Sequence, residues 1–163
     1  MPDYTPEPDI VHELIGHAPM LAVKEFAEFS HMIGLASLGA SEIELKRLGQ
    51  IYWFTVEFGL CKEPEGLRIY GAGIMGSSKE INYALSDVPK KYPLNLFDIA
   101  QNHMHNEITA VQPYYFVAES FENAKQQVTD YIEAMYKPFN VSFNELDSSI
   151  VVDRRIRTRH ERR

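Results

Sequence analysis

The sequence is poor in the features that mark several common classes of protein. It has one cysteine, Cys61, among 163 residues, which excludes a framework of internal disulfides. It has no apolar run of about 18 residues and no leader of basic and then apolar residues, which are the patterns of a membrane span and of a secretory signal. We therefore expect a soluble, cytoplasmic protein of a reducing compartment that has no membrane partner.

Basic residues are also scarce, except at the C-terminal end. Six of the 16 lysines and arginines lie in residues 154–163, and the other 10 face 22 acidic residues in the rest of the chain. Because nucleic-acid grooves are lined by basic side chains, this acidic body argues against a nucleic-acid partner. We interpret residues 153–163 as a basic, disordered tail.

The expected fold class is mainly α with a few short β-strands. Repeats and low-complexity linkers are missing, and an apolar content of 45% in 163 residues suits one domain, which we place at residues 1–152. Pro93 suits the first turn of a helix that continues to Phe97. Helical spacing and serine N-caps predict further helices from Phe26 toward Gly39, from Ser41 toward Cys61, from Ser77 and from Ser120. For residues 51–61, the aromatic and β-branched side chains would also permit a strand. The predicted strands are residues 67–70, 114–118, 139–143 and 150–152.

Residues 9–17 read DIVHELIGH, with His12 and His17 five positions apart. Zinc proteases space their two histidines four apart, because an i, i+4 pair lies within about 40° on one helix face. On a straight α-helix, five residues turn the second side chain about 140° away from the first. A shared metal therefore requires the helix to end or bend between the histidines, and Gly16 lies where we expect that break. For either histidine alone, a helix cap or a core imidazole is the ordinary interpretation.

Glu57 is the only charged side chain in the run IYWFTVEFGL, residues 51–60. A carboxylate in apolar surroundings must pair with a cation, bind a metal or take up a proton. No basic residue lies among residues 48–61, which favours a metal. Two histidines and one carboxylate form the facial triad typical of non-haem Fe(II), but the same set also suits catalytic zinc. The ligand types alone therefore leave the metal open.

Residues 71–76, GAGIMG, match the G-x-G-x-x-G fingerprint of dinucleotide-binding sites. The candidate strand before them is short and contains Arg68, and no second buried strand ending in an acid follows about 20 residues later. We interpret the run instead as a glycine-rich turn that brings the backbone close to a neighbouring site.

Five longer segments carry a resemblance to a known family. They read YTPEPDIVHELIGHAPM (4–20), FSHMIGLASLGA (29–40), IYWFTVEFGLC (51–61), YGAG (70–73) and YYFVAESFENAK (114–125). Together they resemble the pterin-dependent aromatic amino acid hydroxylases, which comprise the phenylalanine, tyrosine and tryptophan hydroxylases. The resemblance runs from Tyr4 to about Val152 and implies the catalytic-domain fold of that family, in its C-terminal part.

The resemblance implies a monooxygenase that depends on Fe(II) and tetrahydrobiopterin and hydroxylates the ring of an aromatic L-amino acid with O2. His12, His17 and Glu57 match the iron ligands. Glu13 matches a catalytic acid that faces the pterin, commonly through water, and Tyr52 matches an aromatic beside the same cofactor. The positions that match the substrate side are Tyr4, Thr5, Pro8, Trp53, Phe58 and Gly73.

The sequence also departs from the family pattern. The family's catalytic domain extends upstream of Tyr4, and that part carries the arginine that binds the substrate's carboxylate. Gly76 stands where the family has a serine near the iron, and a glycine supplies no hydroxyl. We therefore expect a domain that is incomplete at its N-terminus, with homo-oligomers only in a full-length form. The alternative is a non-catalytic iron-binding fragment or regulatory paralogue that associates with related subunits.

Overall fold

The computed structural model describes residues 10–102, 104–107 and 110–156. The helical elements are η1 (His12–His17), α1 (Ala18–Leu21), α2 (Lys24–Ser37), α3 (Glu42–Tyr52), η2 (Trp53–Glu57), α4 (Ala72–Met75), α5 (Ser78–Leu85), α6 (Leu96–Gln101) and α7 (Phe121–Ala134), where η marks a π-helix. The strands are β1 (Leu60–Glu63), β2 (Gly66–Ile69), β3 (Lys90–Pro93), β4 (Tyr114–Ala118), β5 (Val141–Asn144) and β6 (Ser149–Val152). The expected mainly helical fold with short strands is confirmed.

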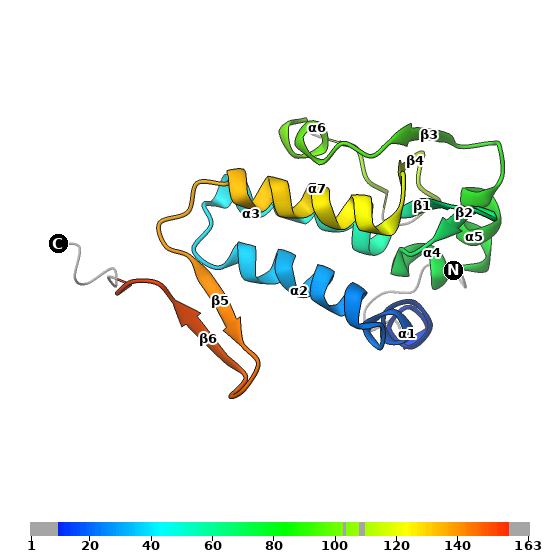
Figure 1. Cartoon of the computed structure of the whole chain (residues 1–163). Helices are drawn as coiled ribbons and strands as arrows, with labels where there is room; N and C mark the ends of the chain where they lie inside the picture. The colour runs from blue at the N-terminus through cyan, green and yellow to red at the C-terminus, as the bar shows by residue number, and fades with distance from the viewer. Residues whose placement is uncertain (1–9, 103, 108–109, 157–163) are drawn as a thin grey trace.

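Three long helices form one layer of the molecule. Helices α2, α3 and α7 lie side by side, and a small sheet stands at one end of them (Figure 1). Their apolar residues recur at helical spacing and meet in a single core that includes Phe26, Phe29 and Ile33 of α2 and Ala124 and Val128 of α7. This layer supports the segments η1 and η2 that carry the predicted metal ligands.

Four strands form the sheet in the order β2-β1-β4-β3. Strands β1 and β2 are an antiparallel hairpin with Leu60 opposite Ile69, whereas β4 runs parallel to both of its neighbours. Strand β1 follows η2 after a short turn, so the sheet fixes the exit of the segment that carries Glu57. A separate antiparallel hairpin, β5–β6, projects away from the helical layer (Figure 1).

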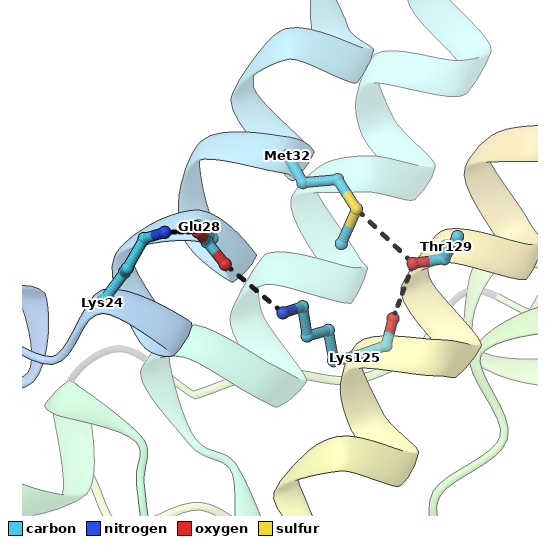
Figure 2. Close-up of polar contacts among 5 residues, drawn as sticks. All are labelled: Lys24, Glu28, Met32, Lys125 and Thr129. Carbon is cyan, nitrogen blue, oxygen red and sulfur yellow. Dashed lines mark hydrogen bonds and ion pairs between the residues drawn. The ribbon is translucent and has the colours of Figure 1, made fainter. Parts of the chain in front are cut away.

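Polar contacts link the outer surfaces of α2 and α7 (Figure 2). Glu28 lies between two lysines, with 3.0 Å from its carboxylate to Lys24 Nζ and 3.4 Å to Lys125 Nζ. The hydrogen bond from Lys24 lowers the pKa of Glu28 below its ordinary value. One helical turn farther along α7, the Thr129 hydroxyl donates to Met32 Sδ at 3.5 Å. The Glu28–Lys125 pair joins the two helices, whereas Lys24 and Glu28 both lie on α2. Because both pairs are largely exposed, they add little to the free energy of unfolding.

The expected serine N-caps are present. Ser77 Oγ accepts a hydrogen bond from the Glu80 backbone N–H at 3.3 Å, and Ser120 Oγ accepts one from that of Asn123 at 3.0 Å. Each bond satisfies a backbone donor that the first turn of a helix leaves open, which fixes where α5 and α7 begin. The caps could be predicted because their chemistry is local to a few residues.

The prediction for Pro93 is wrong. Pro93 ends strand β3, where it pairs with Val117, and the following helix begins at Leu96 with Asn95 as its N-cap. Strand β3 lies at the edge of the sheet, where proline's missing N–H removes no bond to a neighbour. For residues 51–61, expected as a helix with a strand as the alternative, the structure divides the run, with helix up to Glu57 and strand β1 from Leu60.

The predicted tail, residues 153–163, lies partly outside the described residues. At its start, Asp153 accepts hydrogen bonds from the backbone N–H and the side-chain amide of Asn140, at 3.0 and 2.9 Å. Across the part of the chain that the structure describes, every helix is too short or too polar to cross a lipid bilayer.

Candidate metal centre

The two histidines of the DIVHELIGH motif lie on one side of a π-helix. Element η1 runs from His12 to His17, and the Ala18 backbone N–H that follows it donates to the carbonyl of Glu13, five residues earlier. In such a helix the i→i+5 bond closes each turn, so residues five apart stand nearly above one another, as residues four apart do in an α-helix. The spacing that is wrong for an α-helical metal site is therefore right for this one.

The expected break at Gly16 is wrong. The chain remains helical through Gly16 and passes directly from η1 into α1, so the wider helical turn brings the histidines together without a bend. The glycine has a different role, because a Cβ at this position would lie 2.5 Å from the backbone oxygen of Ala72. Gly16 therefore lets η1 approach α4 at backbone distance.

Glu57 ends a second π-helix. Helix α3 is capped by Ser41, whose Oγ accepts from the Glu44 backbone N–H at 3.2 Å, and continues into η2, Trp53–Glu57. The Phe58 N–H donates to the Trp53 carbonyl at 2.9 Å, which is again an i→i+5 bond. Both segments that carry predicted ligands are thus π-helical, a form that is rare in general and frequent at functional sites.

The glycine-rich run 71–76 packs against both π-helices. A Cβ at Gly71 would lie 2.4 Å from the Glu57 backbone oxygen, and one at Gly76 would lie 3.1 Å from the His12 Cα. The run includes the short helix α4, so part of the expected turn is helical. Its expected close approach to a neighbouring site is confirmed, since it holds η1 and η2 beside each other.

The three predicted ligands converge on one point. The His12 Nε2 lies 3.4 Å from one carboxylate oxygen of Glu57, and the His17 Nε2 lies 3.2 Å from the other. One nitrogen or oxygen atom from each residue lies within 4.8 Å of the other two. The side chains are 13–23% exposed, which leaves the site partly open to small molecules. Two imidazoles and a carboxylate at these separations have the chemistry and the reach to hold a divalent metal ion.

Electrostatics around the cluster favour a positive charge. The hydrogen bond with Glu57 raises the pKa of His17 above 6.5, against the opposing effect of burial, and the charges of Glu57 and Glu13 add to the increase. Burial raises the pKa of Tyr52, and the same two carboxylates raise it further. Glu13 itself is exposed. The two residues expected at the pterin therefore lie within electrostatic range of the metal cluster.

The described residues that are expected on the substrate side form an aromatic wall at the two ends of η2. The rings of Trp53 and Phe58 lie 4.8 Å apart at 37°, and a Cβ at Gly73 would lie 2.7 Å from the Phe58 ring. The structure thus brings Trp53, Phe58 and Gly73 together. The other expected substrate residues, Tyr4, Thr5 and Pro8, lie outside the described residues.

One residue that holds this wall was not predicted from the sequence. The buried side chain of Gln112 accepts a hydrogen bond from the Trp53 indole N–H at 3.2 Å. Gln112 lies in a segment without regular spacing, just before β4, so its burial leaves no periodic signal in the sequence.

Comparison with known proteins gives consistent matches. The family described as biopterin-dependent aromatic amino acid hydroxylase matches residues 1–161. Phenylalanine-4-hydroxylase of Dictyostelium discoideum is 49% identical over 152 residues, which cover 93% of this chain and 34% of that protein. Tyrosine 3-monooxygenase of Drosophila melanogaster is 49% identical over 151 residues, or 88% of this chain and 24% of that protein.

The fold is also similar to that of solved structures. Chromobacterium violaceum phenylalanine hydroxylase, in a structure with bound iron(III) and oxidised 7,8-dihydrobiopterin, superposes with a TM-score of 0.71 at 36% identity. The match covers 81% of this chain and 48% of that one. The chain thus spans about a third of the length of the first relative, 34%, and just under half of this crystal chain.

Proposed function

Because this chain belongs to the family of biopterin-dependent aromatic amino acid hydroxylases, we propose that it forms the iron-binding part of a monooxygenase that hydroxylates the ring of an aromatic amino acid. Relatives named for phenylalanine and for tyrosine match it equally well, at 49% identity. The proposed substrate class is therefore phenylalanine, tyrosine or tryptophan, with O2 as the second substrate.

The observation that carries this proposal is the convergence of His12, His17 and Glu57. Their donor atoms approach one another within 4.8 Å, from two π-helices that the glycine-rich run holds together. Each Glu57 oxygen faces a different imidazole, so the carboxylate is already oriented toward the point that the histidines share. Such preorganisation lowers the conformational cost of binding a metal ion.

The residues present fit Fe(II). Two neutral nitrogens and one carboxylate on one side of an ion leave its other side open, which is the arrangement of non-haem iron oxygenases. When bound there, iron together with a reduced pterin supplies the activation of O2 and the electrons that ring hydroxylation requires. The protein's part is to hold the three ligands, to orient the aromatic ring and to limit access of water.

The pterin is proposed to bind on the side of the metal that Glu13 and Tyr52 flank. Glu13 follows His12 directly on η1, and its carboxylate is exposed and free of the metal cluster of His12, His17 and Glu57. It offers acceptors for N–H groups of a pterin ring, directly or through water. The half-buried ring of Tyr52, within electrostatic range of Glu13, offers an aromatic surface for the pterin.

The aromatic substrate is proposed to bind against Trp53 and Phe58. These rings follow Tyr52 and Glu57 along the same chain segment, so an amino acid ring packed on them lies near the metal ligands. Gly73 keeps space beside Phe58 because any larger residue would contact that ring. Offset or edge-to-face contacts between rings would orient the substrate for attack at one ring position.

The proposal is tested by anaerobic titration of the metal-free chain with Fe(II). We expect one ion per chain, displaced competitively by Zn(II) because the ligand set suits both metals. Hydroxylation is then measured with tetrahydrobiopterin, O2 and each of the three aromatic amino acids, both in this chain and in the complete product of its gene. Failure to bind Fe(II) would overturn the proposal.

A second candidate function is a metal-binding unit that associates with other subunits without catalysis. The observation that favours it is an apolar surface on η1 and its N-cap residue, where the side chains of Val11, Leu14 and Ile15 are 52–64% exposed. Exposed apolar side chains this close together favour association with another polypeptide surface. Iron binding together with co-purification of related subunits, and no hydroxylated product from either form, would support this function over the first.

A further inference from the structure

Gln112 is a buried side chain whose hydrogen bonds join the loop before β4 to Trp53 of the proposed substrate wall. Its Oε1 accepts from the Trp53 indole Nε1–H and from the Glu107 backbone N–H, each at 3.2 Å. Its Nε2 donates to the Glu107 carbonyl. One fully buried amide thus ties the loop before β4 to the indole of η2.

Glu80 holds Gln112 from the other side. The Glu80 side chain is fully buried, and its Oε1 accepts from the Gln112 backbone N–H at 2.9 Å and from the Tyr115 hydroxyl. Glu80 lies in the first turn of α5, whose start is fixed by the Ser77 cap. A carboxylate oxygen is a strong acceptor, and a buried donor that loses its acceptor carries the full cost of desolvation.

The chain of contacts therefore runs from α5 through Gln112 to the indole. Trp53 is only half-buried, and one face of its ring meets Phe58 at 4.8 Å. The hydrogen bond to Gln112 acts at the indole N–H and selects one orientation of the ring. Trp53 also begins the π-helix that ends at Glu57, so this orientation is set relative to the metal ligands.

We propose that Glu80 and Gln112 are positioning residues, which hold the Trp53 indole in place as a wall for the aromatic substrate. This role rests on the proposed function for its substrate, but the hydrogen bonds that carry it involve only residues of this chain. Glu80 acts on the backbone of Gln112, and Gln112 acts on the indole. Neither belongs to the metal cluster, so both affect ring orientation without contributing a metal ligand.

Trp53 is the only tryptophan of the chain, which provides a direct measurement. Gln112→Leu removes the acceptor for the indole at similar side-chain volume. Since a net hydrogen bond corresponds to about a fivefold change in an equilibrium, we expect the detached indole population to rise about fivefold. The emission maximum should shift to longer wavelength, and quenching by acrylamide should become stronger, at a temperature well below unfolding.

Gln127→Leu is the matched control. Gln127 also ties a loop, donating to the Leu94 carbonyl at 3.1 Å and accepting from the Leu96 N–H at 3.2 Å, and its hydrogen-bond partners do not include Trp53. A purely structural role for Gln112 predicts that both variants lower the unfolding temperature and that neither changes the emission of the folded chain. Equal emission changes in the two variants, or no change in either, would overturn the proposal.

Two variants of Glu80 test the first step of the chain. Glu80→Gln keeps an oxygen acceptor for the Gln112 N–H and is expected to retain wild-type emission. Glu80→Leu removes the acceptor and is expected to reproduce the shift of Gln112→Leu. If Glu80→Leu does not fold, the test uses Glu80→Gln and Tyr115→Phe, which both keep an acceptor for the Gln112 N–H. Both should keep wild-type emission, whereas Gln112→Leu is shifted. A Glu80→Gln emission equal to that of Gln112→Leu would contradict the role of Glu80.

The substrate part is tested in the complete gene product loaded with Fe(II). Gln112→Leu should raise the KM for L-phenylalanine about fivefold with a smaller change in kcat, because the wall contacts the substrate before and during reaction, whereas Gln127→Leu should change neither. If wild-type protein forms no product while the emission still separates the variants, the proposed function fails and the positioning of Trp53 stands. If product forms but KM is the same in all variants, the role of the wall in substrate binding is overturned.

Discussion

The imidazole rings of His12 and His17 meet edge to face, with their centroids 4.6 Å apart and their planes at 85°. This contact links residues five apart in sequence and exists because η1 closes its turns with i→i+5 bonds. It turns the two Nε2 atoms toward the separate oxygens of Glu57. The geometry leads to four predictions, which concern the charge, protonation, packing and substrate side of the site.

Replacing Glu57 with glutamine should weaken metal binding strongly. The substitution keeps the side-chain size and one oxygen but removes the negative charge that faces both imidazoles. Residues that only hydrogen-bond to a metal ligand already contribute roughly 10- to 100-fold to metal affinity. For a ligand itself we therefore expect a loss of at least about 100-fold. Glu13→Gln is the matched control and should keep the affinity for Fe(II) or Co(II), measured by anaerobic titration. Similar losses in both variants would show that overall negative charge matters and that the ligand role of Glu57 is wrong.

The metal-free chain should lose stability as the pH rises above 6.5. The hydrogen bond with Glu57 raises the pKa of His17 from 6.5, so folding favours the protonated imidazole. The stability from this pairing is complete below pH 6.5 and is lost as the pH rises through the higher pKa of the folded chain. The effect is measured as the unfolding temperature below pH 6.5 and above the pKa of His17 in the folded chain, and His17→Gln should reduce this dependence on pH. Metal affinity should increase over the same rise in pH, since a metal binds the neutral imidazole.

Gly16→Ala should destabilise the fold and the metal site together. The added methyl group would lie 2.5 Å from the Ala72 oxygen, which is backbone and cannot move aside easily. We expect a loss of about 1–3 kcal/mol in the free energy of unfolding, as for other overpacked positions. Gly34→Ala is the control, since a Cβ there meets nothing within 4 Å and should stabilise α2 by about 0.5–1 kcal/mol. Denaturant unfolding of both variants decides the matter, and equal stability changes would contradict the close approach of η1 and α4.

Gly73→Ala should affect substrate use more than metal binding. Its methyl group would displace the Phe58 ring, which now lies 2.7 Å from that position, but the nearest atoms belong to a side chain that can shift. Because displacement of about 1 Å costs up to roughly 100-fold in rate, we expect kcat/KM for the amino acid to fall between about 10- and 100-fold. Fe(II) affinity should stay within about twofold, since coordination bonds are unaffected. A parallel loss of iron binding would show that the glycine supports the ligands instead of the substrate wall.

The members of the candidate metal site could be recognised from sequence because each stands out locally. Glu57 is a lone charge in an aromatic run, and His12 and His17 stand five apart on either side of Glu13 and a short apolar stretch. The kind of helix could not be predicted, because i, i+5 spacing is equally compatible with a bent α-helix and with a π-helix. The role of Gly16 was misassigned for a related reason, since the Ala72 backbone that requires it lies far along the chain.

Elements with local signals were also the ones predicted correctly. The strand at 114–118 and the helix capped by Ser120 have regular spacing and a side-chain cap. Pro93 has the same local preference at the start of a helix as at the end of an edge strand, and only the position of β3 in the sheet decides between them. Gln112 was missed because its importance comes from partners in α5 and η2 that no nearby residue indicates.

The two π-helices make the candidate site depend on residue count as well as on residue type. Deleting one codon between His12 and His17 would leave both histidines and Glu13 in place and would return the spacing to that of the H-E-x-x-H zinc proteases. The segment would then suit an α-helix, and its fit against the Ala72 backbone would be lost. In evolutionary terms, the i, i+5 spacing of this chain and the i, i+4 spacing of the zinc proteases are separated by a single in-frame deletion, so point substitutions elsewhere in η1 can leave the geometry of this site intact while a change of length would alter it.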